Sequence, residues 1–302
     1  MRYVVTGGAG FIGSTLVEAL LGAGNEVVIL DNFETGKRER VPASATLVEG
    51  SITDYETCIQ AFAGSDGVFH TAAIPRMPYS IEHPRETNEV NANGTLTVLL
   101  AARDAGVKRV VYSASSSAYG VQDSLPFVET MTARPMSPYG LQKFIGEEYA
   151  RLFSSLYGLE TVSLRYFNVY GGKFQSADGS YPLVIALFLA QIEAGKKMTL
   201  TGDGEFKRDF THVSDVVRAN MRAMTAPSVG NGEVINIGAG HSYSMKEVAA
   251  LVGGETEFIP ERAGDPRATL ADNSKARELL GWVPEVTLEE GIADLKRIHG
   301  LK

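Results

Sequence analysis

Near its start the chain reads YVVTGGAGFIGS over residues 3–14, an apolar run that turns through glycines into a second apolar stretch. The spacing G-x-G-x-x-G occupies residues 8–13, and Gly7 adds a second spacing with a glycine at every third position. Because the chain has 32 glycines, either spacing alone is weak evidence, and a simple tight turn is the alternative. A strand before the turn and a helix after it favour a dinucleotide site, since the bare backbone can approach a pyrophosphate at the positive helix end. We expect the contacts to come from Gly7, Gly10, Phe11, Ile12 and Gly13.

An acidic residue stands where this fingerprint requires one. Asp31 follows the apolar run Glu26–Leu30, at the end of the second expected strand. A carboxylate there accepts hydrogen bonds from both ribose hydroxyls and repels a 2′-phosphate, which favours NAD over NADP. Lys37 and Arg38 follow closely and leave NADP as the alternative.

The first half of the chain alternates β-branched apolar runs with amphipathic stretches. Strands are expected at Tyr3–Thr6, Glu26–Leu30, Thr46–Val48, Gly67–His70, Lys108–Ser113 and Glu160–Arg165, and helices at Phe11–Leu21, Asp54–Phe62, Thr87–Ala105 and Ser137–Tyr157. Such alternation predicts an α/β fold with a doubly wound parallel sheet of the Rossmann type. The later part predicts helices at Leu183–Ala194, Ser244–Val252, Asn273–Leu280 and Leu288–His299, and strands at Met198–Leu200 and Glu233–Ile237. We expect an NAD-binding domain over residues 1–166, to which some later segments return, and a smaller α/β substrate-binding lobe over residues 167–302.

Composition narrows the class of protein. The chain has 28 Lys and Arg against 36 Asp and Glu, a net charge of −8, which argues against binding to a nucleic acid backbone. Cys58 is the only cysteine, so neither an intramolecular disulfide nor a zinc-cysteine cluster is expected, and the five histidines lack metal-ligand spacing. No run is long and apolar enough for a membrane span, and the opening MRYVVTGGAG does not resemble a signal peptide. We expect a cytoplasmic protein without a metal.

A tyrosine and a lysine stand four residues apart in the expected helix Ser137–Tyr157. Tyr139 and Lys143 would share one helix face, where a nearby ammonium and a cationic nicotinamide ring both favour the phenolate. An exposed Tyr and Lys on an amphipathic helix is the alternative, because this spacing is common. Upstream, SASSSAYG over residues 113–120 places small hydroxyl side chains at the carboxyl end of a strand, where parallel sheets bind ligands. The glycine loop, Asp31, these serines and the Tyr139–Lys143 pair together indicate a dinucleotide-dependent enzyme far more specifically than any one of them alone.

At this point the chain resembles the extended short-chain dehydrogenase/reductase family, and within it the nucleotide-sugar 4-epimerases of the UDP-glucose/UDP-galactose type. The resemblance rests on TGGAGFIGS, LDNFETGKRE, VFHTAA, NANGTL, SASSSAYG, SPYGLQK, LRYFNVYG, GDGEFKRDFTHVSD and RAGDPRATLADNSKARELLGWVP. It implies that Tyr139 is the acid/base that deprotonates the sugar 4-hydroxyl. It implies that Lys143 lowers the pKa of Tyr139 and holds the nicotinamide ribose, and that Ser115 hydrogen-bonds the reacting oxygen. Ser115 lies four residues before Tyr119, and Ser116 and Ser117 are the alternatives if the register differs.

The resemblance also implies further contacts. Beyond the glycine loop, Asp31, Tyr139 and Lys143, the implied cofactor-binding residues are Asn32, Gly36, Ser51, Ile52, Ala72, Ala73, Asn91, Ser113 and Tyr166. The implied substrate-binding residues, besides Ser115, are Asn168, Val184, Arg208, Arg262, Asp265 and Thr269. A salt bridge with Asp209 or Asp265 is the alternative role for the two arginines. Two departures from the family pattern leave contacts open: Ser51-Ile52 in place of Asp-Ile, and Gly172-Lys173 in place of Pro-Arg after Tyr-Gly.

Two positions distinguish reactions within the family. Dehydratases and decarboxylases of the family carry a glutamate two places before the tyrosine of the Tyr-Gly pair, whereas Ser116 and Ser117 stand in this region. Without an extra acid, the resemblance implies a redox-neutral epimerisation at carbon 4 of a UDP-hexose through a 4-keto intermediate. Thr269 replaces a bulky tyrosine of narrow-specificity members, so UDP-N-acetylglucosamine is expected to fit unless a neighbour fills the gap.

Two other functions remain open. The resemblance also implies a quaternary structure. A nucleotide-sugar reductase or dehydrogenase would show net NADH formation or loss, and a non-catalytic NAD-binding regulator would have no need of Ser115, Tyr139 and Lys143. Members of the family pair two helices into a homodimer, here residues 87–105 and 137–157, and coverage of these helices by the second lobe is the alternative.

Overall fold

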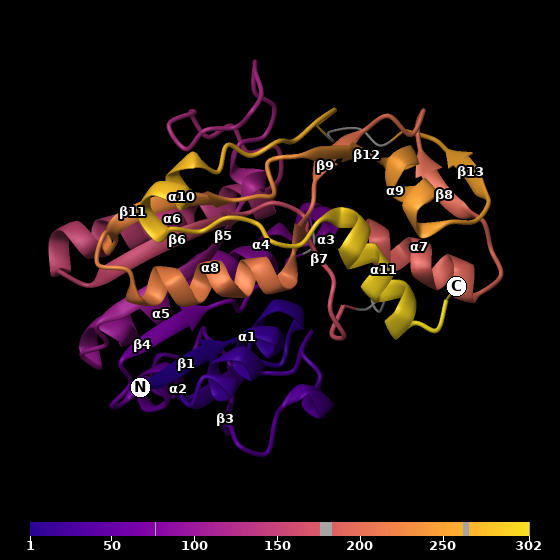
Figure 1. The fold of residues 1–302 in the computed structure, drawn as a ribbon. Helices are drawn as coiled ribbons and strands as arrows, with labels where there is room; N and C mark the ends of the chain where they lie inside the picture. Colours follow the sequence, from indigo (N-terminus) through magenta and orange to yellow (C-terminus); the bar gives the residue numbers. More distant parts are fainter. Residues whose placement is uncertain (76, 176–182, 262–265, 302) are drawn as a thin grey trace.

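A computed structural model describes residues 1–75, 77–175, 183–261 and 266–301. Its centre is a seven-stranded parallel sheet in the order β11-β6-β5-β4-β1-β2-β3 (Figure 1). These strands are β1 (Arg2–Thr6), β2 (Glu26–Asp31), β3 (Thr46–Glu49), β4 (Gly67–His70), β5 (Arg109–Ser115), β6 (Glu160–Tyr166) and β11 (Asn231–Ile237). The chain builds outward from β1 in one direction and then from β4 in the other, so the strand order reverses between β1 and β4. Ligands of such sheets bind at the carboxyl ends of the strands beside this reversal, and the predicted doubly wound sheet is confirmed.

Helices cover both faces because consecutive strand residues point to opposite sides. In β1, Tyr3 and Val5 belong to one apolar core and Val4 to the other. The first core is shared with α1 (Phe11–Gly22), α8 (Val213–Thr225) and α10 (Ser274–Leu280). The second is shared with α2 (Tyr55–Phe62), α5 (Gly94–Asp104) and α6 (Pro138–Tyr157). The near-continuous apolar runs of the strands are explained by burial on both sides.

The predicted helix Thr87–Ala105 is present as a continuous helical stretch, but the structure adds a π-helical turn inside it. The structure has α4 (Pro84–Asn88), a π-helical turn (Glu89–Asn93) and then α5, and it adds a short α3 (Met77–Glu82) before them. A π-turn inserts one residue into the helical repeat and so re-aims a side chain. Here the buried Asn91 lies in that turn and hydrogen-bonds the Ile74 backbone in both directions, at 2.8 and 3.1 Å.

The remaining elements build a second lobe around its own apolar core, at the right of Figure 1. It contains α7 (Val184–Glu193), α9 (Met245–Val252), α11 (Leu288–Ile298) and the parallel pair β8 (Met198–Thr201) and β13 (Thr256–Ile259). Two more short pairs stand between this lobe and the main sheet: β7 (Val169–Tyr170) with β10 (Thr211–His212), and β9 (Lys207–Asp209) with β12 (Ser242–Ser244). α8, β11 and α10 return to the main sheet, and a domain boundary after residue 166 stays a prediction.

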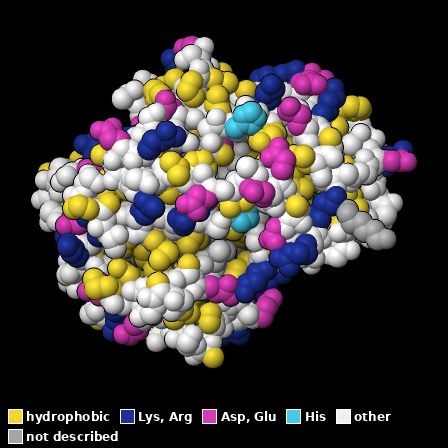
Figure 2. Space-filling view, in the orientation of Figure 1, with side chains coloured by type: hydrophobic (Ala, Val, Ile, Leu, Met, Phe, Trp, Pro, Cys, Tyr) yellow, Lys and Arg dark blue, Asp and Glu magenta, His cyan; other side chains and the backbone are white. Residues whose placement is uncertain are grey.

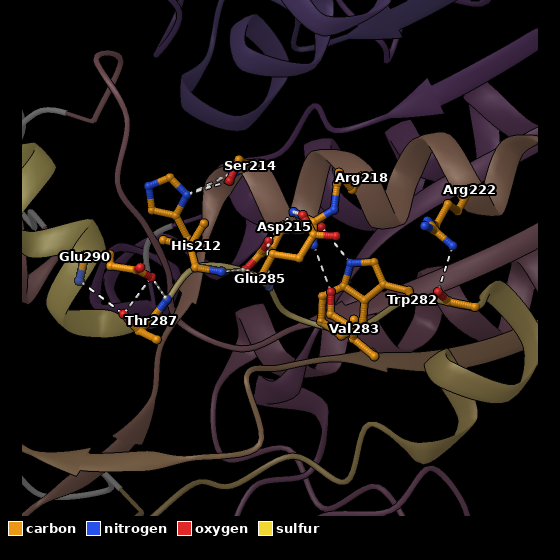
Figure 3. A network of polar contacts seen from close by, with 12 residues as sticks. His212, Ser214, Asp215, Arg218, Arg222, Trp282, Val283, Glu285, Thr287 and Glu290 are labelled. Atoms are coloured by element: carbon orange, nitrogen blue, oxygen red, sulfur yellow. Dashed lines mark hydrogen bonds and ion pairs between the residues drawn. The ribbon is translucent and has the colours of Figure 1, made fainter.

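A polar network ties the segment between α10 and α11 to the start of α8 (Figure 3). The buried Asp215 carboxylate pairs with Arg218 and accepts hydrogen bonds from the backbone amides of Glu285 and Val286, each at 3.2 Å. The Trp282 indole, 1% exposed, donates to the Asp215 carbonyl at 2.9 Å. α10 packs on the main sheet and α11 packs on the core of the second lobe. The network between these helices therefore joins the second lobe to the main sheet.

Surface and composition features are those of an ordinary acidic protein. On the face drawn in Figure 2, Lys and Arg side chains are interspersed with Asp and Glu. In the part of the chain that the structure describes, no helix combines the length and the apolar character that crossing a bilayer requires. Across the same residues, no three or more His, Cys, Asp and Glu side chains gather to hold a metal ion.

Candidate active site

A cavity of about 430 Å³ opens at the carboxyl ends of the central strands. It reaches from the glycine loop after β1, past the end of β2, to the end of β5 and the start of α6. Fifteen of the residues expected from the sequence line it: Gly7, Gly10, Phe11, Ile12, Gly13, Asp31, Asn32, Ser51, Ile52, Ala72, Ala73, Ser115, Tyr139, Tyr166 and Asn168. The fold therefore gathers at one edge of the sheet residues that are up to 161 positions apart in the sequence.

The glycine loop forms a cradle that larger residues would fill. Gly7 has a φ of +69°, and a Cβ there would come within 2.7 Å of the Ala72 Cα. A Cβ on Gly13 would collide with the Gly7 carbonyl, so α1 packs directly against the turn. Gly10 precedes α1 and supplies no side-chain cap to its first turn. The helix N-terminus thus presents backbone amides and a positive dipole end to the cavity, as an anionic pyrophosphate requires.

Two backbone hydrogen bonds fix the Asp31 carboxylate in place at the cavity. Its carboxylate accepts hydrogen bonds from the Ala9 amide at 2.9 Å and the Phe33 amide at 2.8 Å. Each carboxylate oxygen has a second lone pair, which leaves acceptor capacity toward the cavity. Arg38 is one of the two cations that made NADP an alternative cofactor. Its guanidinium pairs with the Glu49 carboxylate at 2.7 Å, and its Cζ lies 4.2 Å from the Phe33 ring centroid. The donor set and the glycine cradle together fit NAD.

Tyr139 and Ser115 meet at the inner end of the cavity. α6 begins at Pro138 with Ser137 as its N-cap, which sets Tyr139 in the first turn beside the end of β5. β5 runs two residues further than predicted, so that Ser115 is its last residue, paired with Tyr166 of β6. Burial raises the pKa of Tyr139 to about 12, and a hydrogen bond with Ser115 opposes that rise. Of the three candidate serines, Ser115 has this bond, while the Ser117 hydroxyl accepts from Ser115 at 3.0 Å.

Lys143 lies one helical turn beyond Tyr139 and is 3% exposed. Its ammonium donates to the Ser113 carbonyl at 2.8 Å and stands 5.0 Å from the Tyr112 ring centroid. Burial lowers the pKa of Lys143 to about 8, and the negative charge of Glu147 opposes that shift. The side chain is thus still an ammonium at neutral pH, and it lies one helical turn beyond Tyr139 on α6.

Besides Lys143, three implied cofactor residues are absent from the cavity lining. Gly36 faces Asp31, where a Cβ would come within 2.7 Å of the carboxylate. The Asn91 amide holds Ile74 and also donates to Gln142 at 2.9 Å. The Ser113 hydroxyl contacts the Tyr166 hydroxyl at 3.0 Å, and its carbonyl binds Lys143. In this structure these side chains support the wall rather than line it.

The implied substrate residues lie in different parts of the structure. Asn168 lines the cavity, and its side chain donates to the Asp209 carbonyl at 2.8 Å. Arg208 lies in β9, and Thr269 lies in a segment beside this strand, where the Thr269 amide donates to the Lys207 carbonyl at 3.1 Å. The Asp209 carboxylate accepts from the amides of Ala239, Gly240 and Ala271.

The other substrate residues bear less directly on the cavity. Val184 packs against the lobe core. Arg262 and Asp265 lie outside the described residues.

Comparison with known proteins places the chain. Residues 3–238 match the model of the NAD dependent epimerase/dehydratase family. The chain belongs to this family. A UDP-glucose 4-epimerase of Mycolicibacterium smegmatis is 39% identical, over 97% of this chain and 96% of that protein. The structure of the Thermotoga maritima UDP-glucose 4-epimerase with UDP-glucose superposes with a TM-score of 0.94 at 37% identity, covering 99% of this chain and 98% of the other. That of the Thermus thermophilus UDP-glucose 4-epimerase with NAD gives 0.90 at 35% identity, covering 99% of each chain.

Membership in this family confirms the resemblance drawn from the sequence motifs and makes NAD the cofactor. In this NAD-dependent epimerase/dehydratase family member, the cavity has further lining residues that the sequence did not indicate. Among them are Arg40, Phe174, Gln175 and Leu183. The signal that could have found Phe174 and Gln175 is the departure from the expected Pro-Arg at Gly172-Lys173, because these two residues follow it directly.

Proposed function

We propose that the protein interconverts the two carbon-4 epimers of a UDP-hexose, UDP-glucose and UDP-galactose, through a 4-keto intermediate. The observation that carries the proposal is that the Ser115 hydroxyl and the Tyr139 phenol, 24 positions apart in the sequence, line the same cavity, with the buried Lys143 one helical turn beyond Tyr139. Serines follow Ser115 at positions 116 and 117, so this end of β5 supplies no carboxylic acid for an elimination. A site with one acid/base group suits a cycle that removes a proton and a hydride and returns both.

Bound NAD supplies a hydride acceptor that returns the hydride within the same turnover. The protein's own part is proton transfer and orientation. Tyr139 takes the proton of the sugar 4-hydroxyl and later returns it, while Ser115 holds the same oxygen through a hydrogen bond. We assign to Lys143 the role of stabilising the phenolate by its positive charge, because burial alone raises the pKa of the phenol.

Anchoring the nucleotide lets the sugar turn over between the two transfers. We assign binding of the diphosphate to Arg208, Arg262 and Asn168, and further substrate contacts to Val184 and Asp265. Arginine suits this role because its planar fork makes paired, charge-assisted bonds to phosphate. The Arg208 guanidinium already donates to the carbonyls of Lys207 and Pro266, at 2.9 and 2.8 Å, which restricts its orientation.

The test is purified protein with UDP-galactose and no added NAD, followed by chromatography of the nucleotide sugars. UDP-glucose should form without net absorbance growth at the NADH wavelength. A steady rise in that absorbance would instead identify a reductase or dehydrogenase. No turnover of any UDP-hexose, with bound NAD confirmed, would favour a non-catalytic NAD-binding regulator.

Thr269 supports a wider substrate range that includes UDP-N-acetylglucosamine. The side chain is small, 7% exposed, and its hydroxyl accepts a hydrogen bond from the Asp209 amide at 3.4 Å. Thr269→Tyr should therefore lower turnover of the N-acetyl sugar by about tenfold or more and keep that of UDP-galactose, because added bulk discriminates by such factors. Steady-state kinetics on both sugars measures this ratio. Thr269→Val, which keeps the volume, is the control, and equal N-acetyl activity in Thr269→Tyr and the parent would mean that a neighbour fills the gap.

We also propose a homodimer formed through residues 87–105 and 137–157. The second lobe leaves part of α6 uncovered: Leu152, Leu156 and Tyr157 are 38%, 66% and 52% exposed. Burying such apolar surface against a second copy is favourable. Light scattering on the parent should give twice the chain mass, and a mass of one chain at micromolar concentration would reject this assembly.

We further propose that the protein works in the cytoplasm, which fractionation of its source cells would test.

A further inference from the structure

The four residues after Gly171 follow β7 and include two residues, Phe174 and Gln175, that line the cavity; β7 lies near the middle of Figure 1. Phe174 and Gln175 line the cavity opposite Gly10 and Phe11 of the glycine loop. This segment comes shortly after β6 and β7 in the chain. Two of its polar contacts are nevertheless with elements beside the glycine loop and Asp31: α1 and the short 3-10 helix η1 (Arg38–Arg40).

Two polar contacts hold the segment down. The Lys173 ammonium pairs with the Glu18 carboxylate of α1 at 2.7 Å. The Arg40 guanidinium of η1 donates to the Phe174 carbonyl at 2.9 Å. Both cations also lie near the Phe174 ring, with Lys173 Nζ 4.8 Å and Arg40 Cζ 5.7 Å from its centroid. The ring is thus held between two positive groups, a favourable arrangement for an aromatic face.

Gln175 adds an unused donor at the cavity wall. It is 5% exposed, and its Oε1 accepts a hydrogen bond from the Gly171 amide, which orients the side-chain amide. Its Nε2 is buried and has no hydrogen-bond partner in the described structure. An unsatisfied buried donor costs free energy, and a ligand oxygen in the cavity would remove that cost.

We propose that Lys173, Phe174 and Gln175 form a strap that closes over bound NAD and slows its release. The strap is latched to α1 through Glu18 and to η1 through Arg40, and the Gln175 amide donates to an oxygen of the dinucleotide. Its purpose rests on the proposed redox-neutral cycle: a reduced cofactor that left before the hydride returned would strand the keto sugar. Exposed ion pairs are individually weak, so the latch can still open when the cofactor is first loaded.

The experiment measures NAD release in the absence of any sugar. Protein loaded with radiolabelled NAD is diluted into excess unlabelled NAD, and retained label is followed by rapid filtration. Phe174→Ala and Lys173→Glu should each release NAD at least about fivefold faster than the parent, the upper range for loss of an exposed pair. The double variant Lys173→Glu/Glu18→Lys restores the opposite charges and should return release to within about twofold of the parent. Lys197→Ala, which breaks an equivalent pair with Glu255 at 2.8 Å on the lobe, is the matched control and should change nothing.

Unchanged release from both Phe174→Ala and Lys173→Glu would overturn the strap, even if the epimerase assay succeeds. Faster release without charge-swap rescue would overturn the Lys173–Glu18 latch. Faster release with rescue supports the strap whether or not UDP-galactose is turned over. Because no sugar is present, failure of the strap and failure of the proposed reaction are read independently.

Discussion

Tyr139→Phe is expected to lower turnover of UDP-galactose by about 10²–10⁴-fold, the usual contribution of a positioned acid/base group. The ring that packs at the start of α6 remains, and only the hydroxyl that bonds Ser115 is lost. NAD should stay bound, because the glycine loop and Asp31 lie at the other end of the cavity. The measurement pairs steady-state turnover with the NAD content of the purified variant, read after denaturation.

Tyr149→Phe is the control for this substitution. It removes a phenol from the same helix, but Tyr149 packs against the apolar core behind the sheet and does not line the cavity. Its turnover should match that of the parent. A Tyr139→Phe variant with full activity and bound NAD would show that another group moves the proton.

Glu147→Gln is expected to lower the free energy of unfolding by about 3–5 kcal/mol, the cost of leaving one partner of a buried ion pair alone. Glu147 lies one turn beyond Lys143 on α6, and its carboxylate binds the Arg165 guanidinium of β6 at 2.9 and 2.6 Å. Their side chains are 0% and 4% exposed, and the guanidinium lies 4.4 Å from the Tyr119 ring centroid. Burial raises the pKa of Glu147, and the charge and hydrogen bonds of Arg165 oppose that rise. The amide keeps the shape of the carboxylate but leaves the buried cation without its counter-charge.

The neighbouring residue provides the matched control. Glu148 pairs with Arg151 at 2.9 Å on the surface of the same helix, where both side chains are about half exposed. Glu148→Gln should change the free energy of unfolding by no more than about 0.5 kcal/mol. Urea unfolding followed by circular dichroism measures both variants. Equal stabilities for Glu147→Gln and Glu148→Gln would mean that the buried pair contributes no more than the surface one.

Local sequence predicts the main sheet because each strand and its helix lie close together in the chain. The glycine loop, Asp31 and the Tyr139–Lys143 pair depend on contiguous residues or one helical repeat, and each stands where the pattern placed it. The sequence patterns did not predict the five short strands β7, β9, β10, β12 and β13, because runs of two to four residues show no periodicity. The π-turn was not predicted, and its buried Asn91 hydrogen-bonds Ile74, a contact 17 positions away in the sequence that no local pattern indicates.

By itself the sequence determined the fold class, the cofactor and the identity of the hydroxyl, phenol and ammonium groups, since all of these follow from residue type and short spacing. Only the tertiary structure decided which serine bonds Tyr139, because that depends on where β5 ends relative to α6. It also decided that Lys173 and Phe174 lie over the cradle, against Glu18 and Arg40. The two residues of each pair are more than a hundred positions apart in the sequence. Local preferences for helix, strand or turn cannot predict contacts between residues so far apart.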